Sequence, residues 1–441
     1  MAETSIVSWT KWEDNPQLKF KFFYLLTLIV DSMEDETLDI ARRLIELSDN
    51  RICNHCLGRK FSDKIEGKDN EERGLKIREE LSFDNPKNDD ICPICQNTFE
   101  KINEELFNRI QDKIDSIGLE FDNYLVGSKI PKEILNKDDE ISERYDFKVE
   151  NIKKEVNRII GKEIGLIYNK DAEFKHNDIT IEINFKKYNP SVYIQINPIF
   201  IEGTYNKYKR GIPQTKWLCR KCHGKGCEYC NYKGKMYPES VEELLSDVLL
   251  EKTKGRSCKF HGAGREDIDV LMLGDGRPFV IEVVEPKIRN IDLRELEDEA
   301  NNHAAGKTRY NNLKYSKRNR KAEIKLSSPD AYKVYEAIVD CDDEIDEEEL
   351  EILKTLDLIK QQTPQRVLRR RADKVREKRV LGVETEIIGP KSFKMKVKTQ
   401  GGLYIKELIS SDEGRSNPSV TSLLNKQCVC RQLDVIEVSK K

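Results

Sequence analysis

The sequence has almost no net charge and no long apolar run, and both absences narrow its function. Its 77 lysine and arginine residues are balanced by 80 aspartate and glutamate residues, which leaves a net charge of -3 over 441 residues. A uniformly basic nucleic-acid-binding protein is therefore excluded, although local basic clusters are not. The apolar stretch at residues 22–30 is nine residues long and is too short to span a bilayer. The sequence thus predicts no membrane segment.

Histidine is scarce, and its placement excludes one class of base-modifying enzyme. Zinc-dependent nucleobase deaminases need a histidine followed two positions later by glutamate. None of the five histidines meets this requirement. A strand-to-helix glycine loop for a nucleotide or a methyl donor is also lacking, because Gly274-Asp275-Gly276 is predicted to be a hairpin turn between two strands.

Cysteine, in contrast, is abundant and regularly spaced. Eight of the twelve cysteines form four C-x-x-C pairs, which in a chain of this length indicates metal sites and a reducing compartment, so we expect the cytosol. Two pairs separated by 35 residues, and two pairs only four residues apart, each supply four thiolates for a structural zinc ion. A redox dithiol is the alternative. The predicted ligands are Cys53, Cys56, Cys92 and Cys95, and then Cys219, Cys222, Cys227 and Cys230.

The most informative stretch is residues 259–285, KFHGAGREDIDVLMLGDGRPFVIEVVE. It is predicted to contain a glycine-punctuated turn, an apolar strand, a tight turn and a second apolar strand. Asp267 lies where the glycine-rich turn enters the first of these strands. A carboxylate at this place is either a turn cap or a reactive group, and the local pattern does not distinguish the two.

The letters GRED followed by IDVLMLGDGRPFVIEV resemble the catalytic motif of the archaeal and eukaryotic pseudouridine synthases that modify tRNA positions 54 and 55. The resemblance extends over about residues 37–438. It implies that Asp267 is the catalytic carboxylate, with Asp269 as the internal alternative. It also implies a reaction that needs no cofactor.

Further motifs of that family suggest substrate-binding residues. Residues 333–339 resemble the second motif, which implies that Tyr335 stacks on the target base; a tyrosine packed in the core is the alternative. Residues 402–407 resemble the third motif, so Lys406 is expected to pair with Asp267, although this position is commonly arginine in related families. The resemblance further points to Tyr404 of that motif, to Arg265 for filling the vacated base position or holding a phosphate, and to Leu424 or Leu423 for the apolar pocket wall.

The resemblance also predicts the fold, which is α+β. An N-terminal zinc-containing THUMP-type RNA-binding domain is expected at residues 37–210, and a catalytic domain with a mixed, largely antiparallel sheet at 211–441, with a zinc knuckle at 219–230. Residues 1–36 form an extension in which Met33 is a candidate true start; an extra docking helix is the alternative.

Two basic stretches are candidate RNA contacts. Residues 205–210 interleave tyrosines with cations, which suits phosphate contact and base stacking, and residues 366–379 carry eight cations that a helix would align on one face. A solvated basic surface is the alternative for both.

Together these features predict an enzyme that isomerises uridine to pseudouridine at position 54, position 55 or both of the tRNA T-arm loop. A non-catalytic, zinc-containing RNA-binding protein is the alternative. The expected partner is tRNA, with no membrane, no protein partner and a monomeric chain.

Overall fold

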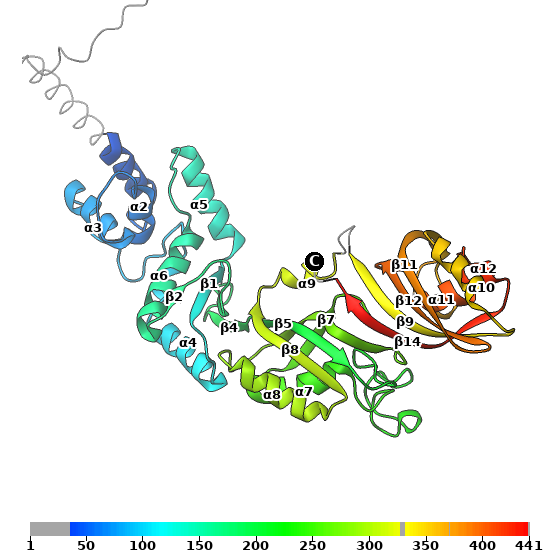
Figure 1. Ribbon diagram of the computed structural model, residues 1–441. Coiled ribbons are helices and arrows are strands. Elements are labelled where there is room, and N and C mark those ends of the chain that lie inside the picture. Colours follow the sequence, from blue (N-terminus) through cyan, green and yellow to red (C-terminus); the bar gives the residue numbers. More distant parts are fainter. Residues whose placement is uncertain (1–35, 327–330, 370, 440–441) are drawn as a thin grey trace, which may run out of the picture. The chain divides into compact units, whose positions relative to one another are not determined.

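A computed structural model describes residues 36–326, 331–369 and 371–439 (Figure 1). The extension for which Met33 was proposed as the true start lies outside the described residues. The chain divides into two compact units, with the division between Gln195 and Ile196. Within the described ranges, no helix combines the length and the apolar composition that crossing a membrane requires.

The first unit contains a helix at residues 36–47 and a small sheet with further helices. The sheet has the strand order β2-β1-β3-β4, and β1 runs parallel to both β2 and β3. The elements are α2 (Asn54–Lys60), α3 (Asn70–Leu81), η2 (Phe99–Lys101), α4 (Glu104–Ile117), β1 (Asn123–Lys129), α5 (Lys132–Arg144), α6 (Ile152–Tyr168), β2 (Asp171–Ala172), β3 (Ile179–Asn184) and β4 (Ser191–Ile196).

Local apolar patterns account for several of these elements. Ile152, Val156 and Ile160 recur at helical spacing and are fully buried on one face of α6. Ile179 and Ile181 alternate with polar residues and point into the core from β3. These patterns therefore explain why α6 forms a helix and β3 a strand.

The second unit is built on a ten-stranded sheet whose main path is β13-β10-β11-β12-β9-β14-β7-β5-β8, with β6 paired to β7. Its pairings are antiparallel except for that of β14 with β7, so the predicted mixed, largely antiparallel sheet is confirmed. The strands are β5 (Ile199–Lys207), β6 (Ser257–Gly262), β7 (Leu271–Val284), β8 (Thr308–Ser316), β9 (Tyr332–Cys341), β10 (Leu358–Gln362), β11 (Val375–Gly389), β12 (Ser392–Gln400), β13 (Ser416–Asn417) and β14 (Cys428–Val438).

Helices cover parts of this sheet (Figure 1). Leu245 and Leu249 of α7 and Leu296 of α8 are fully buried in the same core as the inward residues of β5 and β7. Ser240 caps α7 by accepting a hydrogen bond from the Glu243 N–H at 3.1 Å, as its spacing predicts. The helices are η3 (Glu228–Cys230), α7 (Val241–Thr253), α8 (Leu293–Ala304), α9 (Arg320–Glu323), α10 (Glu347–Glu351), η4 (Ile352–Thr355), η5 (Gln365–Val367), α11 (Ile405–Ser410) and α12 (Val420–Leu424).

Strand β5 belongs to the second sheet, although the sequence analysis placed residues up to 210 in the first domain. It pairs along its length with β7 and with β8. Its apolar side chains, such as the fully buried Ile201, complete the core of the second unit.

Two local predictions are wrong. Gly274-Asp275-Gly276 is not a hairpin turn but a bulge inside the continuous strand β7. Tyr205 of β5 pairs with Arg277 of β7, and Lys207 pairs with Met272, so a shorter stretch of β5 lies opposite a longer stretch of β7. Residues 366–379 are not one helix, because η5 ends at Val367 and residues from Val375 onwards pair with β10 and β12 in strand β11. Strand pairing overrides the helical spacing of the cations here.

Candidate active site

The loop at residues 263–270, here called the β6–β7 loop, lies in a gap of the second sheet. One edge of β7 pairs with β14 at Leu271 and Met272 and with β6 from Phe279 onwards, which leaves the middle of that edge without a strand. The loop fills this gap, and the Ala263 N–H donates to the Pro278 carbonyl at 2.9 Å. Residues from three strands are thereby brought to one place.

Gly264 allows the tight path of this loop. Its φ is +87°, and a Cβ at this position would lie 2.9 Å from Lys333 Nζ and 3.0 Å from Arg277 Nη1. Both the backbone conformation and the close approach of two cationic side chains therefore favour glycine.

A buried network supports the loop from below. Glu266 accepts hydrogen bonds from the Tyr205 hydroxyl at 2.8 and 2.9 Å and from Arg277 Nε at 2.9 Å. Lys207 Nζ donates to the backbone carbonyls of Asp267 at 3.1 Å and Ile268 at 3.2 Å. Burial lowers the pKa of Lys207 to about 8. These contacts fix the backbone on which the Asp267 side chain is presented.

The same network corrects the interpretation of residues 205–210 as an RNA contact. Tyr205 and Lys207 are both fully buried, so neither can reach a phosphate or a base. Arg210 is also engaged within the protein, with Nη2 2.8 Å from Asp434 Oδ2. Tyr208 is 47% exposed and remains available for contact.

Two cations from distant parts of the chain face Asp267. Arg366 Nη1 lies 3.0 Å from Asp267 Oδ2, and Lys406 Nζ lies 3.9 Å from the same oxygen. Lys406 makes its closer contact with Asp269, at 2.6 Å. The structure thus contains the predicted pair of Lys406 with Asp267, and Arg366 is the closer cation.

Arg366 is itself held by Glu407 of α11. Its Nε donates to Glu407 Oε1 at 2.6 Å, and the Glu407 side chain is only 6% exposed. Burial lowers the pKa of Arg366, but the hydrogen bond and the charge of Glu407, together with the charge of Asp267, outweigh it and raise the pKa overall. Arg366 is thus a permanently charged partner of Asp267, and the Glu407 carboxylate holds its guanidinium in place.

The sequence analysis missed Arg366 as a site residue. Its ion pair with Asp267 joins residues 99 positions apart, and it lies within a basic run that was interpreted as an RNA-facing helix. The density of arginines in that run was the sequence signal that could have pointed to Arg366.

The two predicted tyrosines lie close to these charges. Tyr335 is partly buried on β9 and packs against the core; burial raises the pKa of Tyr335 to about 12, and the nearby charges of Asp267 and Glu266 add to the increase. Tyr404 precedes α11, and the Arg366 guanidinium carbon lies 6.0 Å from the centre of its ring. Both rings therefore share the surroundings of Asp267 and Arg366.

Arg265 and Leu424 differ in accessibility. Arg265 is exposed, and its guanidinium carbon lies 5.1 Å from the centre of the Trp217 ring. Leu424 is 8% exposed and belongs to the hydrophobic core, whereas the adjacent Leu423 is only partly buried. Of the two leucines considered for the pocket wall, Leu423 is the accessible one.

Both predicted cysteine sets come together. Within each set, the four sulfur atoms lie within 4.8 Å of one another. In the second set, Cys219 Sγ and Cys227 Sγ are 3.8 Å apart, as are Cys222 Sγ and Cys230 Sγ. This spacing equals the edge of a tetrahedron with about 2.3 Å from its centre to each sulfur, so the thiolates fit zinc.

Histidine does not complete either cysteine set. His55 stacks on Phe99 with 4.3 Å between the ring centres, and its Nδ1 lies 3.1 Å from Glu155 Oε1. His55 is therefore a packing residue beside the first cysteine set and is not one of its four ligand candidates.

Comparison with known families and proteins is consistent with this arrangement. Residues 200–439 match the family model described as "Pus10, C-terminal", and residues 106–184 match the one described as "Pus10 THUMP domain, archaeal". The chain is 48% identical over 408 residues to the tRNA pseudouridine synthase Pus10 of Methanothermobacter marburgensis, covering 91% of this chain and 100% of that protein. It is 44% identical over 386 residues to the protein of the same name in Methanocaldococcus jannaschii, covering 83% of each.

A solved structure titled "Crystal Structure of a Cbf5-Nop10-Gar1 Complex" is also similar, at 14% identity, with a TM-score of 0.31 and coverage of 54% of this chain and 48% of that one. Because its identity and its TM-score are this low, this structure carries no argument about the family of the chain.

Proposed function

Because the chain belongs to the Pus10 family of tRNA pseudouridine synthases, we propose that it converts uridine to pseudouridine at position 54, position 55 or both in the tRNA T-arm loop, with Asp267 as the catalytic carboxylate. The supporting observation is the ion pair of Asp267 with Arg366 and Lys406 on a rigid glycine-containing loop. The reaction breaks the bond from N1 of the base to the ribose, rotates the base and joins C5 to the same ribose carbon. It needs no external energy source and no redox cofactor.

Asp267 must be ionised to act on the ribose, either by attacking the sugar carbon or by removing a ribose proton. Two cations lie within 4.0 Å of the carboxylate, and its 36% exposure leaves it accessible to substrate. The buried lysine and glutamate beneath the loop hold its backbone, so the carboxylate is positioned before the RNA arrives.

The target base must leave the loop stack to reach Asp267. In this proposal Tyr335 receives the flipped base, and Leu423 supplies the apolar wall. Arg265, steadied by Trp217, fills the vacated position or holds a phosphate. Exposed Tyr208, Arg369 and the cations of residues 371–379 add contacts to the tRNA backbone.

We also propose that each cysteine tetrad holds a structural zinc ion. Cys53, Cys56, Cys92 and Cys95 would bind one ion, and Cys219, Cys222, Cys227 and Cys230 the other. Zinc would contribute cross-linking of the chain and no chemistry at uridine. Sites of this kind persist in a reducing compartment, which suits the cytosol.

The direct test is to incubate the protein with an unmodified tRNA transcript and to map pseudouridine by carbodiimide adduct stops in reverse transcription. We expect stops in the T-arm loop at position 54, position 55 or both. A tRNA that binds and shows no such stops would contradict the proposal and favour a non-catalytic RNA-binding protein.

A second prediction is that Arg366 contributes more than Lys406 to the rate of pseudouridine formation. Arg366→Met should slow pseudouridine formation in single turnover by about 10²- to 10³-fold, because it removes the closer charge facing Asp267. Lys406→Met should cost about tenfold, since its closer partner is Asp269. Single-turnover rates at saturating enzyme separate this effect from weaker tRNA binding.

Arg366→Met also leaves the buried Glu407 without a partner, so Arg366→Met combined with Glu407→Gln is the matched control. The double variant should remain folded and equally slow. Arg256→Met, which removes an exposed pair with Glu285, should leave the rate within about twofold. A larger loss in Lys406→Met than in Arg366→Met would contradict the assignment.

A further inference from the structure

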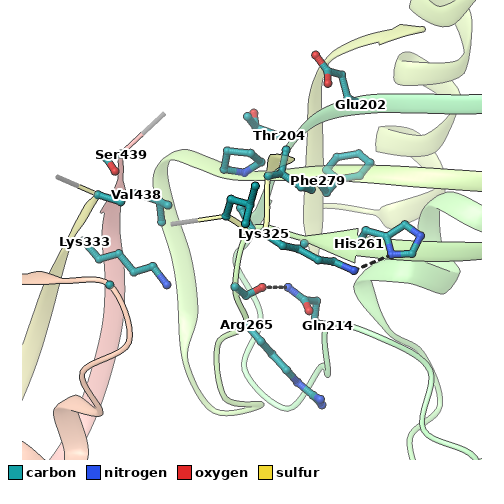
Figure 2. Close-up of a pocket in the computed structure, with 18 of the residues that line it drawn as sticks. Glu202, Thr204, Gln214, His261, Arg265, Phe279, Lys325, Lys333, Val438 and Ser439 are labelled. Atoms are coloured by element: carbon teal, nitrogen blue, oxygen red, sulfur yellow. Dashed lines mark hydrogen bonds between the residues drawn. The ribbon is translucent and has the colours of Figure 1, made fainter. Parts of the chain in front are cut away.

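A cavity of about 890 Å³ adjoins the β6–β7 loop in the second unit (Figure 2). Its walls include residues 262–265 of that loop region, Phe260 and His261 of β6, and Tyr332 and Lys333 at the start of β9. Asp267 does not line it, so the cavity lies beside the proposed active site without containing it. A volume in this range suits a bound nucleotide or another small molecule.

Two cations on the cavity wall pair with a carboxylate. Lys314 Nζ and Arg320 Nε lie 3.0 and 2.7 Å from Glu202, which is the acidic residue on this wall. Lys325 Nζ lies 3.1 Å from His261 Nδ1. The Glu202 carboxylate thus balances Lys314 and Arg320, whereas Lys325 contacts a histidine.

Lys333 differs from the other cations. Figure 2 shows its side chain projecting from the strand side toward the cavity, opposite Lys325 and His261. Among the described residues, no carboxylate lies within 4.0 Å of its Nζ. The ammonium lies against Gly264, where Arg277 adds a second positive charge.

A bound anion would offset the positive charges of Lys333 and Arg277. Burial lowers the pKa of Lys333 to about 7, and the charge of Arg277 adds to the decrease. The Arg277 charge is already engaged, because its Nε donates to Glu266 and its Nη1 donates to the Ala263 carbonyl. Among the described residues, Lys333 thus has no carboxylate within 4.0 Å, although it lies close to a second cation.

The part of the cavity wall formed by β6 and β7 is largely apolar. Phe260 and Phe279 stack with 4.9 Å between ring centres and an interplanar angle of 16°. Pro278 and the partly exposed ring of His261 continue this surface. An apolar wall on one side of a cavity and a cation on the other suit a nucleobase and its phosphate.

We propose that this cavity binds a nucleotide of the RNA next to the target uridine, with the phosphate of that nucleotide on Lys333. The inference rests on the proposed function and deepens it, because it assigns a second RNA subsite to the same loop. Asp267 would act on one nucleotide while Lys333, on the other side of Gly264, holds its neighbour.

The test measures tRNA binding at several salt concentrations for the full chain. Lys333→Met should raise the Kd about tenfold and reduce the slope of log K against log salt by about one, because one phosphate contact is lost. Lys333→Arg should restore most of the affinity and most of the salt slope. Lys287→Met is the matched control, since Lys287 is exposed and does not line the cavity, and it should leave the slope unchanged.

A second measurement identifies the phosphate. T-arm stem-loops carrying one neutral methylphosphonate linkage at a time are bound to wild type and to Lys333→Met. One linkage next to the target uridine should weaken binding to wild type and have no further effect in the variant. If every neutral linkage weakens both proteins equally, Lys333 contacts no phosphate and the proposal fails.

A free nucleotide is the other source of the same chemistry. Titration with uridine 5′-monophosphate distinguishes it: saturable binding to wild type that Lys333→Met abolishes, with an unchanged salt slope for tRNA, would overturn the RNA assignment. Because these measurements report binding, they are independent of catalysis. A protein that shows the Lys333 effect yet forms no pseudouridine would contradict only the proposed function.

Discussion

Asp267→Asn is expected to abolish pseudouridine formation, with a fall in the single-turnover rate of about 10⁴-fold or more. The amide has almost the same shape as the carboxylate but is neither a nucleophile nor a base, so it serves neither route of attack on the ribose. The loop backbone should be retained, because the Lys207 ammonium bonds the backbone carbonyl of Asp267 and not its side chain. Pseudouridine mapping on a tRNA transcript measures the loss.

The matched control is Asp269→Asn in the same loop. Asp269 is 65% exposed and pairs with Lys406, so its replacement should change the rate by only a fewfold. Both variants should bind tRNA and melt at nearly the wild-type temperature. If Asp269→Asn abolishes the reaction while Asp267→Asn retains it, the catalytic role belongs to Asp269. If both variants are fully active, the motif is structural.

Loss of the first cysteine tetrad is expected to unfold the first unit. Structural zinc sites contribute about 10–16 kcal/mol in apparent binding free energy, which is comparable to or larger than the about 5–15 kcal/mol that stabilises a typical domain. Zinc here would fix α2, which lies between Cys53 and the following loop. Chelation, or Cys53→Ser, should therefore make residues 36–195 sensitive to protease.

Buried charges increase this expected effect. Arg59 and Lys60 of α2 are fully buried and pair with Asp138 at 2.9 and 2.7 Å, and Arg59 also pairs with Glu155 at 2.6 Å. Displacing α2 would leave both carboxylates buried without a cationic partner, which costs several kcal/mol. The tetrad and this ion-pair cluster therefore support each other.

Metal analysis by mass spectrometry checks the same prediction. The wild-type protein should carry two zinc ions, and Cys53→Ser should carry one. Cys430→Ser, at a cysteine outside both tetrads, is the control and should keep two. A chain that stays folded and free of metal, with its cysteines cycling between thiol and disulfide, would instead indicate the redox alternative.

Several features follow from the sequence alone. Apolar residues at helical spacing predict α6, and alternating isoleucines predict β3, because each pattern can bury its apolar side chains in only one kind of element. The paired C-x-x-C spacing predicts both tetrads, since each pair already places two sulfur atoms near one ion. The GRED motif and its resemblance identify the family and direct attention to Asp267.

Tertiary structure alone decided which charges surround Asp267. Arg366 reaches it because β10, η5 and α11 bring a segment 99 residues away to the β6–β7 loop, and no local pattern encodes that approach. Tyr205 and Lys207 appear in the sequence as an RNA contact, yet pairing of β5 with β7 and β8 buries both of them. Local periodicity specifies which face of an element is buried, whereas ion-pair partners depend on where distant elements meet, and that is fixed only when the whole sheet assembles.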